Sequence, residues 1–350
     1  MADLRRSPHR WRPVLALLLL APLVGEYLLG NTPVTELGSL PLYLPLYGCG
    51  ALLIREMTRR TGRGWPTMLL LGAAYGLWEE GPVDQMLWNP QYGGFDFGLT
   101  YAGTHVPLLG TSVALLQDVV SMHMIWSISV PIALVEAFRR DPQRPWLGRP
   151  GLIVTGLVFA VGSAGLAAIQ YAANGRFMAS AWQWTVGLVA IAGLILAAFL
   201  VPHIPRRQVE TAAPNPWLAG CAAFALTSAY WVGQAVLRDR VSDWALVIGW
   251  LALAAIAAVV GINWSQRRGW AAEHRAAVAV GALLTYVWVG FTHASDMGVP
   301  MSTALIGNVV FGTGALLLAA AALRSAASGR PADSGPAGSV DSDRSTSTGR

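Results

Sequence analysis

The sequence predicts an all-α fold, a polytopic bundle of about ten transmembrane helices with both termini on the cytoplasmic side. Three observations predict it. Of the 350 residues, 54% are hydrophobic and only 12% are charged, whereas a soluble domain carries about 25% charged residues. The apolar residues form long runs, and the arginines gather in the short segments between those runs. Most of the chain is therefore expected to lie in lipid.

The apolar runs define the expected helices in order. A helix needs about 20 apolar residues to cross about 30 Å of hydrocarbon. By this criterion the spans lie near residues 13–30, 38–57, 65–87, 110–137, 151–172, 181–202, 216–237, 242–263, 273–294 and 301–323.

The arginines predict the orientation, because segments rich in Lys and Arg stay in the cytoplasm. All 24 basic residues are arginine, which excludes chemistry that depends on a lysine. Every second connecting segment carries a cluster, and both termini belong to that set. The segments between them carry only Arg176 and the pair Arg238 and Arg240, which is the exception to the pattern. We therefore expect a multi-pass protein of the cell membrane with cytoplasmic termini.

The chain divides into two expected regions. Residues 1–324 form the transmembrane domain, with most of the intramembrane charge in 1–140 and a mainly apolar part in 150–324. Residues 325–350 are Ser, Gly, Pro, Asp and Arg with almost nothing apolar, which is typical of a disordered tail. The expected partner is the lipid bilayer. The arginine clusters indicate topology and not a nucleic-acid surface, and the sequence assigns no soluble partner, cofactor or metal.

The third span carries the clearest sign of function. Glu79, Glu80 and Asp84 fall within six residues of one another, and each carboxylate costs roughly 3 kcal/mol to insert near the centre of a membrane helix. Such residues usually face a cavity or a partner. Glu80 and Asp84 are four apart and share a helix face, whereas Glu79 points about 100° away.

The same stretch contains Gly81-Pro82. Pro82 removes the hydrogen bond to the carbonyl of Trp78 and crowds it. A broken helix within hydrocarbon is tolerated only where protein or water satisfies the freed backbone groups. The acidic residues and the helix break thus predict one protein-lined or water-containing pocket.

The fourth span supplies possible partners for these carboxylates. His123 and Ser127 are four apart on one face, and Asp118, five residues before His123, is expected near the outer edge. At about 1.5 Å per residue, His123 lies at about the depth of Glu79 and Glu80, roughly 10 Å from the outer edge. Glu26 of the first span and His293 of the ninth also fall in this outer layer. The expected site therefore uses Glu79, Glu80 and His123 as catalytic residues, with binding residues Asp84, Asp118, Ser127, Glu26 and His293.

Residues 79–87, EEGPVDQML, resemble the E-E-x-x-x-R-G-x-L motif of the CPBP (Abi, CAAX-protease-like) intramembrane metalloproteases. His123 follows at a spacing similar to that of the family's second motif, F-x-x-x-H. The resemblance covers about residues 65–135, and it implies that Glu79 or Glu80 activates water and that His123 is one polar member of the centre. The chain departs from the family at Asp84, where the family has Arg, and at Val119, where it has Phe; we find no third-motif histidine in a later span.

Three classes of function fit these residues. The first is a membrane hydrolase, divergent from the CPBP enzymes, in which carboxylates and a histidine activate water. The second is a proton-coupled transporter, because such proteins use broken helices and intramembrane carboxylates. The third is a non-catalytic membrane scaffold, which the missing arginine and second histidine favour. The sequence alone leaves all three open.

Overall fold

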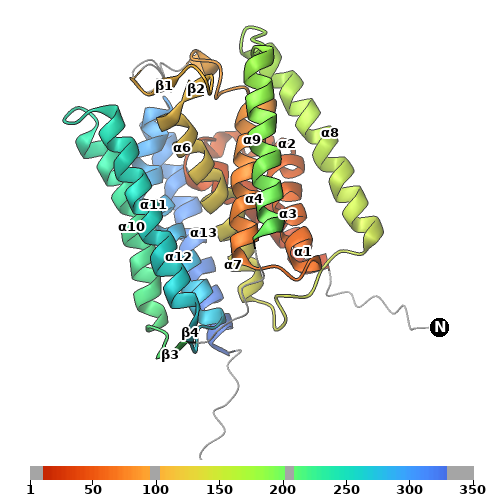
Figure 1. Ribbon diagram of the computed structural model, residues 1–350, viewed down its shortest axis with the longest axis vertical. Helices are drawn as coiled ribbons and strands as arrows, with labels where there is room; N and C mark the ends of the chain where they lie inside the picture. The colour runs from red at the N-terminus through yellow and green to blue at the C-terminus, as the bar shows by residue number, and fades with distance from the viewer. Residues whose placement is uncertain (1–10, 95–102, 202–208, 329–350) are drawn as a thin grey trace, which may run out of the picture.

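The computed structural model describes residues 11–94, 103–201 and 209–328, and these residues form a helical bundle (Figure 1). The all-α prediction is confirmed. The α-helices, the 3₁₀ and π-helical segments (η) and the short strands follow in this order: α1 Trp11–Pro22, η2 Leu23–Leu28, η3 Val34–Ser39, α2 Leu40–Tyr43, η4 Leu44–Gly48, α3 Cys49–Arg60, α4 Trp65–Trp78, η5 Glu79–Val83, η6 Tyr92–Gly94, β1 His105–Val106, β2 Thr111–Ser112, α6 Val113–Met122, η7 His123–Ser129, α7 Val130–Ala137, α8 Arg149–Ala173, α9 Ala181–Leu200, β3 Val209–Ala212, α10 Pro216–Leu237, α11 Asp243–Ser265, β4 Arg267–Arg268, α12 Ala272–Asp296 and α13 Met301–Ser328.

Within the described residues, nine helical segments are long and apolar enough to cross a membrane. They correspond to nine of the ten predicted spans. The remaining one, predicted at 65–87, is helical from Trp65 to Val83 as α4 and η5. It is not among the nine because Glu79 and Glu80 lie in its last turns and reduce its hydropathy. The polar residues that single out this helix are those of the predicted site.

The helices separate into a central and a peripheral set. In the helical unit Val113–Ala137, 72% of the most apolar stretch is buried, and in Ala272–Ala294 the share is 61%. The corresponding shares are 11% for α9, 6% for α11 and 0% for α10. The peripheral helices therefore present apolar side chains such as Val189 and Ile248 outward, as expected for helices that face lipid.

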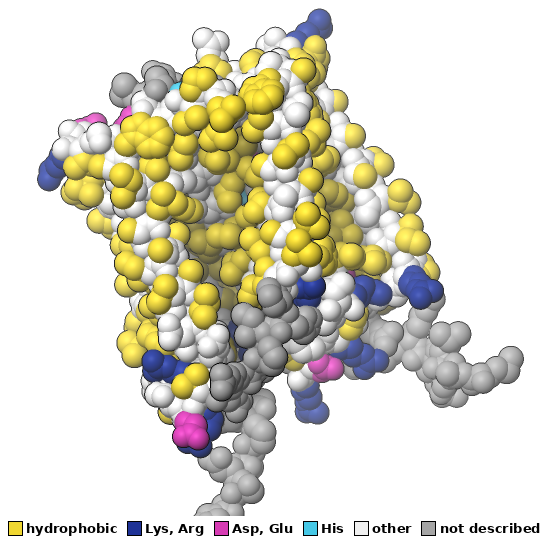
Figure 2. Space-filling model, in the orientation of Figure 1, with side chains coloured by type: hydrophobic (Ala, Val, Ile, Leu, Met, Phe, Trp, Pro, Cys, Tyr) yellow, Lys and Arg dark blue, Asp and Glu magenta, His cyan; other side chains and the backbone are white. Residues whose placement is uncertain are grey.

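The two ends of the bundle differ in charge (Figure 2). One end, here called the arginine-rich end, carries most of the described arginines, including those that follow α3, α7 and α11. The other end, here called the loop end, holds residues 84–94 and the short β1–β2 hairpin, in which His105 pairs with Ser112. The predicted tail begins at residue 325, but residues 325–328 belong to the last turn of α13. The rest of the predicted tail, 329–350, lies outside the described residues.

A buried ion cluster closes the arginine-rich end. Glu136 of α7 accepts from Arg55 Nε at 3.1 Å and from Arg59 Nη2 at 2.6 Å. Arg55 also bonds Glu56 at 2.7 Å, and its guanidinium lies 3.6 Å from the ring centroid of Trp146. The backbone N–H of Trp146 donates to Glu56 at 2.7 Å. The cluster thereby ties the 138–149 segment to α3, a role that the arginine pattern alone did not indicate.

Candidate functional site

The described residues contain four π-helical segments, and each of them contributes to one buried cluster. The segments are η2, η4, η5 and η7. They carry Glu26, Tyr47, the pair Glu79 and Glu80, and His123, respectively. A π-turn is rare, widens the helix locally and is frequent at functional sites. Four of them meeting at one place make this the most unusual part of the bundle.

Proline explains why the helices widen there. A proline lies within two residues of each π segment, and Pro82 lies inside η5. Because proline has no N–H and crowds the preceding turn, the regular spacing of hydrogen bonds cannot continue. Beyond Pro82 the backbone N–H of Asp84 reaches five residues back to the carbonyl of Glu79 at 2.7 Å. The helix break predicted at Gly81-Pro82 is therefore a π-turn, and the helix ends at Val83.

His123 lies between the two glutamates. Its Nε2 is 2.8 Å from Glu80 Oε1, and its Nδ1 is 3.0 Å from Glu79 Oε2. Ser127 Oγ is also 3.1 Å from Nδ1. The three charged or titratable side chains are buried, with 2 to 7% of their surface exposed. Glu79 was expected to point away from Glu80, but both glutamates contact His123 because the imidazole inserts between two consecutive residues.

Close helix packing makes this contact possible. A Cβ at position 76 would lie 3.2 Å from the Cβ of His123, so Gly76 allows α4 to approach η7 closely. A Cβ at position 25 would lie 2.8 Å from Ser127 Oγ, so η2 also lies against η7. Two tyrosine rings flank the imidazole: the ring centroids of Tyr47 and Tyr75 each lie 5.8 Å from that of His123. We refer to Glu79, Glu80 and His123 as the Glu–His–Glu cluster.

Glu26 extends this cluster toward the loop end. The hydroxyl of Tyr47 donates to Glu26 Oε1, and the hydroxyl of Thr32 lies 3.5 Å from Glu26 Oε2. Thr32 in turn is 3.1 Å from the hydroxyl of Tyr43. Glu26 is close enough to interact electrostatically with each member of the Glu–His–Glu cluster. A predicted binding residue from the first span thus reaches the same region as the carboxylates of the third.

Asp84 caps the loop-end side of the cluster through a different set of contacts. Its Oδ2 accepts from the hydroxyl of Tyr92 at 2.8 Å and from Gln170 Nε2 at 3.2 Å. Burial and the neighbouring Asp84 carboxylate raise the pKa of Tyr92, which lies in the loop beyond η5. The phenol therefore stays protonated and serves as a donor to Asp84.

Two of the predicted binding residues lie apart from this cluster. Asp118 lines a small pocket between α6, α10 and α11, together with Arg238 and Asp243. His293 Nε2 bonds Asn31 at 2.8 Å, and its ring packs 5.8 Å from that of Trp231. Arg238, which departs from the predicted arginine pattern, interacts electrostatically with Asp118. The loop-end arginine therefore has a local acidic partner.

The sequence did not indicate Tyr47, Tyr75, Thr32 or Tyr43 as site residues. Aromatic residues in apolar spans usually indicate packing, and Thr32 lies in a connecting segment. The spacing of Tyr43 and Tyr47, four residues apart, does predict that both lie on the same helix face. That face meets Glu26 only because η2 and η4 pack together.

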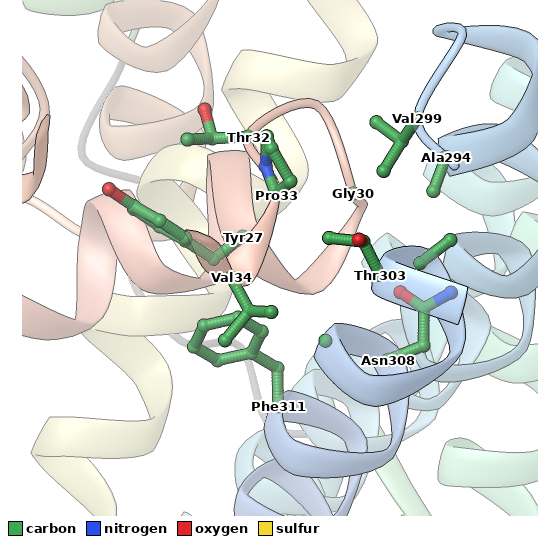
Figure 3. Close-up of a pocket in the computed structure, with 12 residues that line it drawn as sticks. Tyr27, Gly30, Thr32, Pro33, Val34, Ala294, Val299, Thr303, Asn308 and Phe311 are labelled. Carbon is green, nitrogen blue, oxygen red and sulfur yellow. The ribbon is translucent and has the colours of Figure 1, made fainter. Parts of the chain in front are cut away.

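A shallow pocket lies beside this region, between the segment after η2 and helices α12 and α13 (Figure 3). Its lining is mainly apolar, with Val34, Val299 and Phe311 around it. Figure 3 shows the hydroxyl of Thr32 pointing away from the pocket. The polar side of Thr32 therefore belongs to the Glu26 network, and the pocket itself holds none of the predicted catalytic residues.

The Glu–His–Glu cluster keeps unused hydrogen-bonding capacity. Glu80 Oε2 and the hydroxyl of Tyr75 are buried and form no aligned hydrogen bond to the described residues. Glu79 Oε2 lies 3.0 Å from His123 Nδ1, but this contact is not aligned as a hydrogen bond. Buried polar atoms of this kind are usually satisfied by ordered water. Among the described residues, no three His, Cys, Asp or Glu side chains form an arrangement that could hold a metal ion.

Residues 15–325 match the model of an uncharacterized membrane protein family. The chain belongs to this family. The match covers all of the bundle from α1 to α13 except for a few residues at each end, and it confirms the prediction of a membrane protein. It does not confirm the resemblance to the CPBP proteases. No curated protein and no solved structure matches the chain.

Proposed function

We propose that this protein is a membrane-embedded hydrolase in which the Glu–His–Glu cluster activates water. The observation that supports the proposal most is the meeting of four π-helical segments around His123, with its two ring nitrogens 2.8 and 3.0 Å from Glu80 and Glu79. Three buried titratable groups and four irregular turns are costly in a membrane bundle. A passive contact between helices needs neither.

The geometry suggests a role for each residue. Glu80 Oε1 is held by His123, whereas Oε2 forms no hydrogen bond to the described part of the chain and is available to a water molecule. Glu80 accepts a proton from that water as its oxygen bonds to the carbonyl carbon of an ester or amide. His123, stabilised as a cation by Glu79, donates a proton to the leaving group as the carbon–heteroatom bond breaks. The resemblance to the CPBP enzymes implies the activating role for Glu79 or Glu80, and it makes His123 one polar member of the centre.

Incorporation of oxygen from water tests hydrolysis without a known substrate. We expect membranes of the native cells, incubated in water enriched in ¹⁸O, to accumulate at least one product with ¹⁸O in a carboxylate. Glu80→Gln should reduce that product about 100-fold or more, because the general base is lost. Glu36→Gln, at an exposed carboxylate of the same end, is the matched control and should have no effect. Mass spectrometry that finds no labelled species dependent on Glu80 would contradict the proposal.

A second candidate function is proton-coupled transport. The interruption of four neighbouring helices favours it, because transporters bind substrate and ions at discontinuous helices. In that case the Glu–His–Glu cluster would exchange protons without consuming water. Net substrate accumulation driven by a pH gradient in proteoliposomes, with no ¹⁸O-labelled product, would favour this candidate over the hydrolase.

We further propose that the arginine-rich end faces the cytoplasm of a cell-membrane protein, with both termini on that side. In a background without Cys49 and Cys221, single cysteines at positions 94 and 174 of the loop end should react with an impermeant maleimide added to intact cells. Cysteines at positions 64 and 265 should not react until the membrane is opened. Labelling at position 64 in intact cells would reverse the orientation.

A further inference from the structure

We propose that Glu26 is a proton relay that connects the Glu–His–Glu cluster to the loop-end surface, through Tyr47 on one side and through Thr32 and Tyr43 on the other. This inference rests on the proposed acid–base role of the cluster. The proton that Glu80 takes from water can return to His123 across their 2.8 Å contact, which resets the cluster. The carboxylic acid product of ester hydrolysis then ionises and releases one net proton, and the relay gives that proton an exit.

The contacts run in a consistent direction. The hydroxyl of Tyr43 is 3.1 Å from that of Thr32, and Thr32 Oγ1 donates to Glu26 Oε2 at 3.5 Å. From the other side, Tyr47 donates to Glu26 Oε1. The carboxylate thus accepts a hydrogen bond on each oxygen. Tyr43 and Glu26 are only half-buried, whereas Tyr47 is buried beside His123.

The chemistry of these groups suits proton transfer. Tyr, Thr and Glu side chains can each accept a proton and release one, because each offers both donor and acceptor states. The other polar route to the loop end runs through Asp84 and Tyr92 to Gln170. There the Gln170 amide donates to both Asp84 and Tyr92. Tyr92 also donates directly to Asp84, so the amide does not interrupt this second route, and the variant Asp84→Asn in the test below distinguishes the two routes.

The step between Tyr47 and the Glu–His–Glu cluster requires a bridging water molecule. No hydrogen bond among the described residues joins Tyr47 to Glu79 directly. The rings of Tyr47 and Tyr75 are 6.2 Å apart, and both flank His123. In this same region the Tyr75 hydroxyl and Glu80 Oε2 form no aligned hydrogen bond to any residue that the structure describes. A water molecule bound there would satisfy them and complete the chain of hydrogen bonds.

Several titratable groups face Glu26 and share its electrostatic environment, so its protonation cannot be treated alone. They come from η2, α2, η4, α4, η5, the helix end after it, η7 and α12: Tyr27, Tyr43, Tyr47, Tyr75, Glu79, Glu80, Asp84, His123 and Tyr286.

Carbodiimide labelling tests the relay without a substrate. Dicyclohexylcarbodiimide is hydrophobic and modifies protonated carboxyl groups, and peptide mass spectrometry reports its adduct on Glu79 and Glu80. The full chain is placed in proteoliposomes of one orientation, with the pH set separately on the two sides. We expect labelling of the cluster to rise when the pH is lowered at the loop end and to stay unchanged when it is lowered at the arginine-rich end.

The relay variants should slow this response. Tyr47→Phe and Glu26→Gln should each reduce its rate at least about tenfold, because a proton-transferring group is removed. Tyr27→Phe is the matched control, since the Tyr27 hydroxyl donates to the Glu36 carbonyl and not to the relay. If Glu26→Gln does not fold, Tyr47→Phe still decides the question, because it deletes a single hydroxyl.

Three results would overturn the inference. The first is carbodiimide labelling that responds to the pH at the arginine-rich end, and the second is labelling that responds to the pH on neither side. The third is a normal response in Tyr47→Phe together with a lost response in Asp84→Asn. The assay also separates this inference from the proposed function. If Tyr47→Phe slows the labelling response but no ¹⁸O-labelled product forms, the relay stands and hydrolysis is rejected. If ¹⁸O-labelled product forms and Tyr47→Phe responds like the wild-type protein, only the relay is rejected.

Discussion

Glu80→Gln and His123→Ala are each expected to abolish formation of the ¹⁸O-labelled product, and the double variant should be no worse than either single change. The reason is that Glu80 and His123 share a 2.8 Å contact and act as one unit, so removing either disables both. Each single change should reduce the rate by about two to four orders of magnitude. Thermal stability in detergent should fall little in Glu80→Gln, because the amide keeps the shape and is less costly to bury than a charge.

The opposite pattern would assign the same residues to a structural contact. Full product formation in both single variants, combined with a large loss of thermal stability, is what a static clamp between η5 and η7 predicts. Ser127→Ala is a useful intermediate variant, because it removes only the 3.1 Å contact at Nδ1. We expect a smaller loss of rate from it than from His123→Ala.

The largest loss of stability should come from the arginine-rich end. Glu136→Ala leaves Arg55 and Arg59 buried without their shared carboxylate, and Arg55 has no exposed surface. Breaking a buried ion cluster in this way costs about 3–5 kcal/mol. Unfolding in mixed micelles titrated with SDS measures the change. Glu210→Gln, at an exposed carboxylate, serves as the control, and a loss below about 1 kcal/mol in Glu136→Ala would show that Glu56 and the 142–144 carbonyls suffice for the two arginines.

Much of the bundle could be predicted from the sequence because lipid imposes a simple rule on apolar length. The nine most apolar segments correspond to predicted spans, and the tenth, from Trp65 to Val83, lies where the acidic motif predicted it. The π-helical turns within these spans could not be predicted in the same way. Pro82 predicted a break in the helix. Whether the break becomes a π-turn depends on how the neighbouring helix packs against the widened backbone, and no periodicity in the sequence indicates that packing.

The candidate site was predictable only in part. Glu80 and His123 were predicted to lie at similar depths in consecutive spans, and on that basis we expected them to be close. In the structure they are in contact. Depth alone could not separate them from His293, which lies in the same expected layer but bonds Asn31. Side-by-side placement depends on which helices are neighbours, and this is set by close approaches such as Gly76 against His123.

The ¹⁵N resonances of the His123 ring test the central claim, that a single imidazole is held between two buried glutamates, most directly. With labelled histidine in lipid bilayers, we expect Glu80→Gln to shift the Nε2 resonance and Glu79→Gln to shift the Nδ1 resonance, because each nitrogen has its own carboxylate partner. Glu36→Gln should leave both resonances unchanged. Identical spectra in the wild-type protein and in both site variants would show that His123 does not contact these glutamates and would contradict the account.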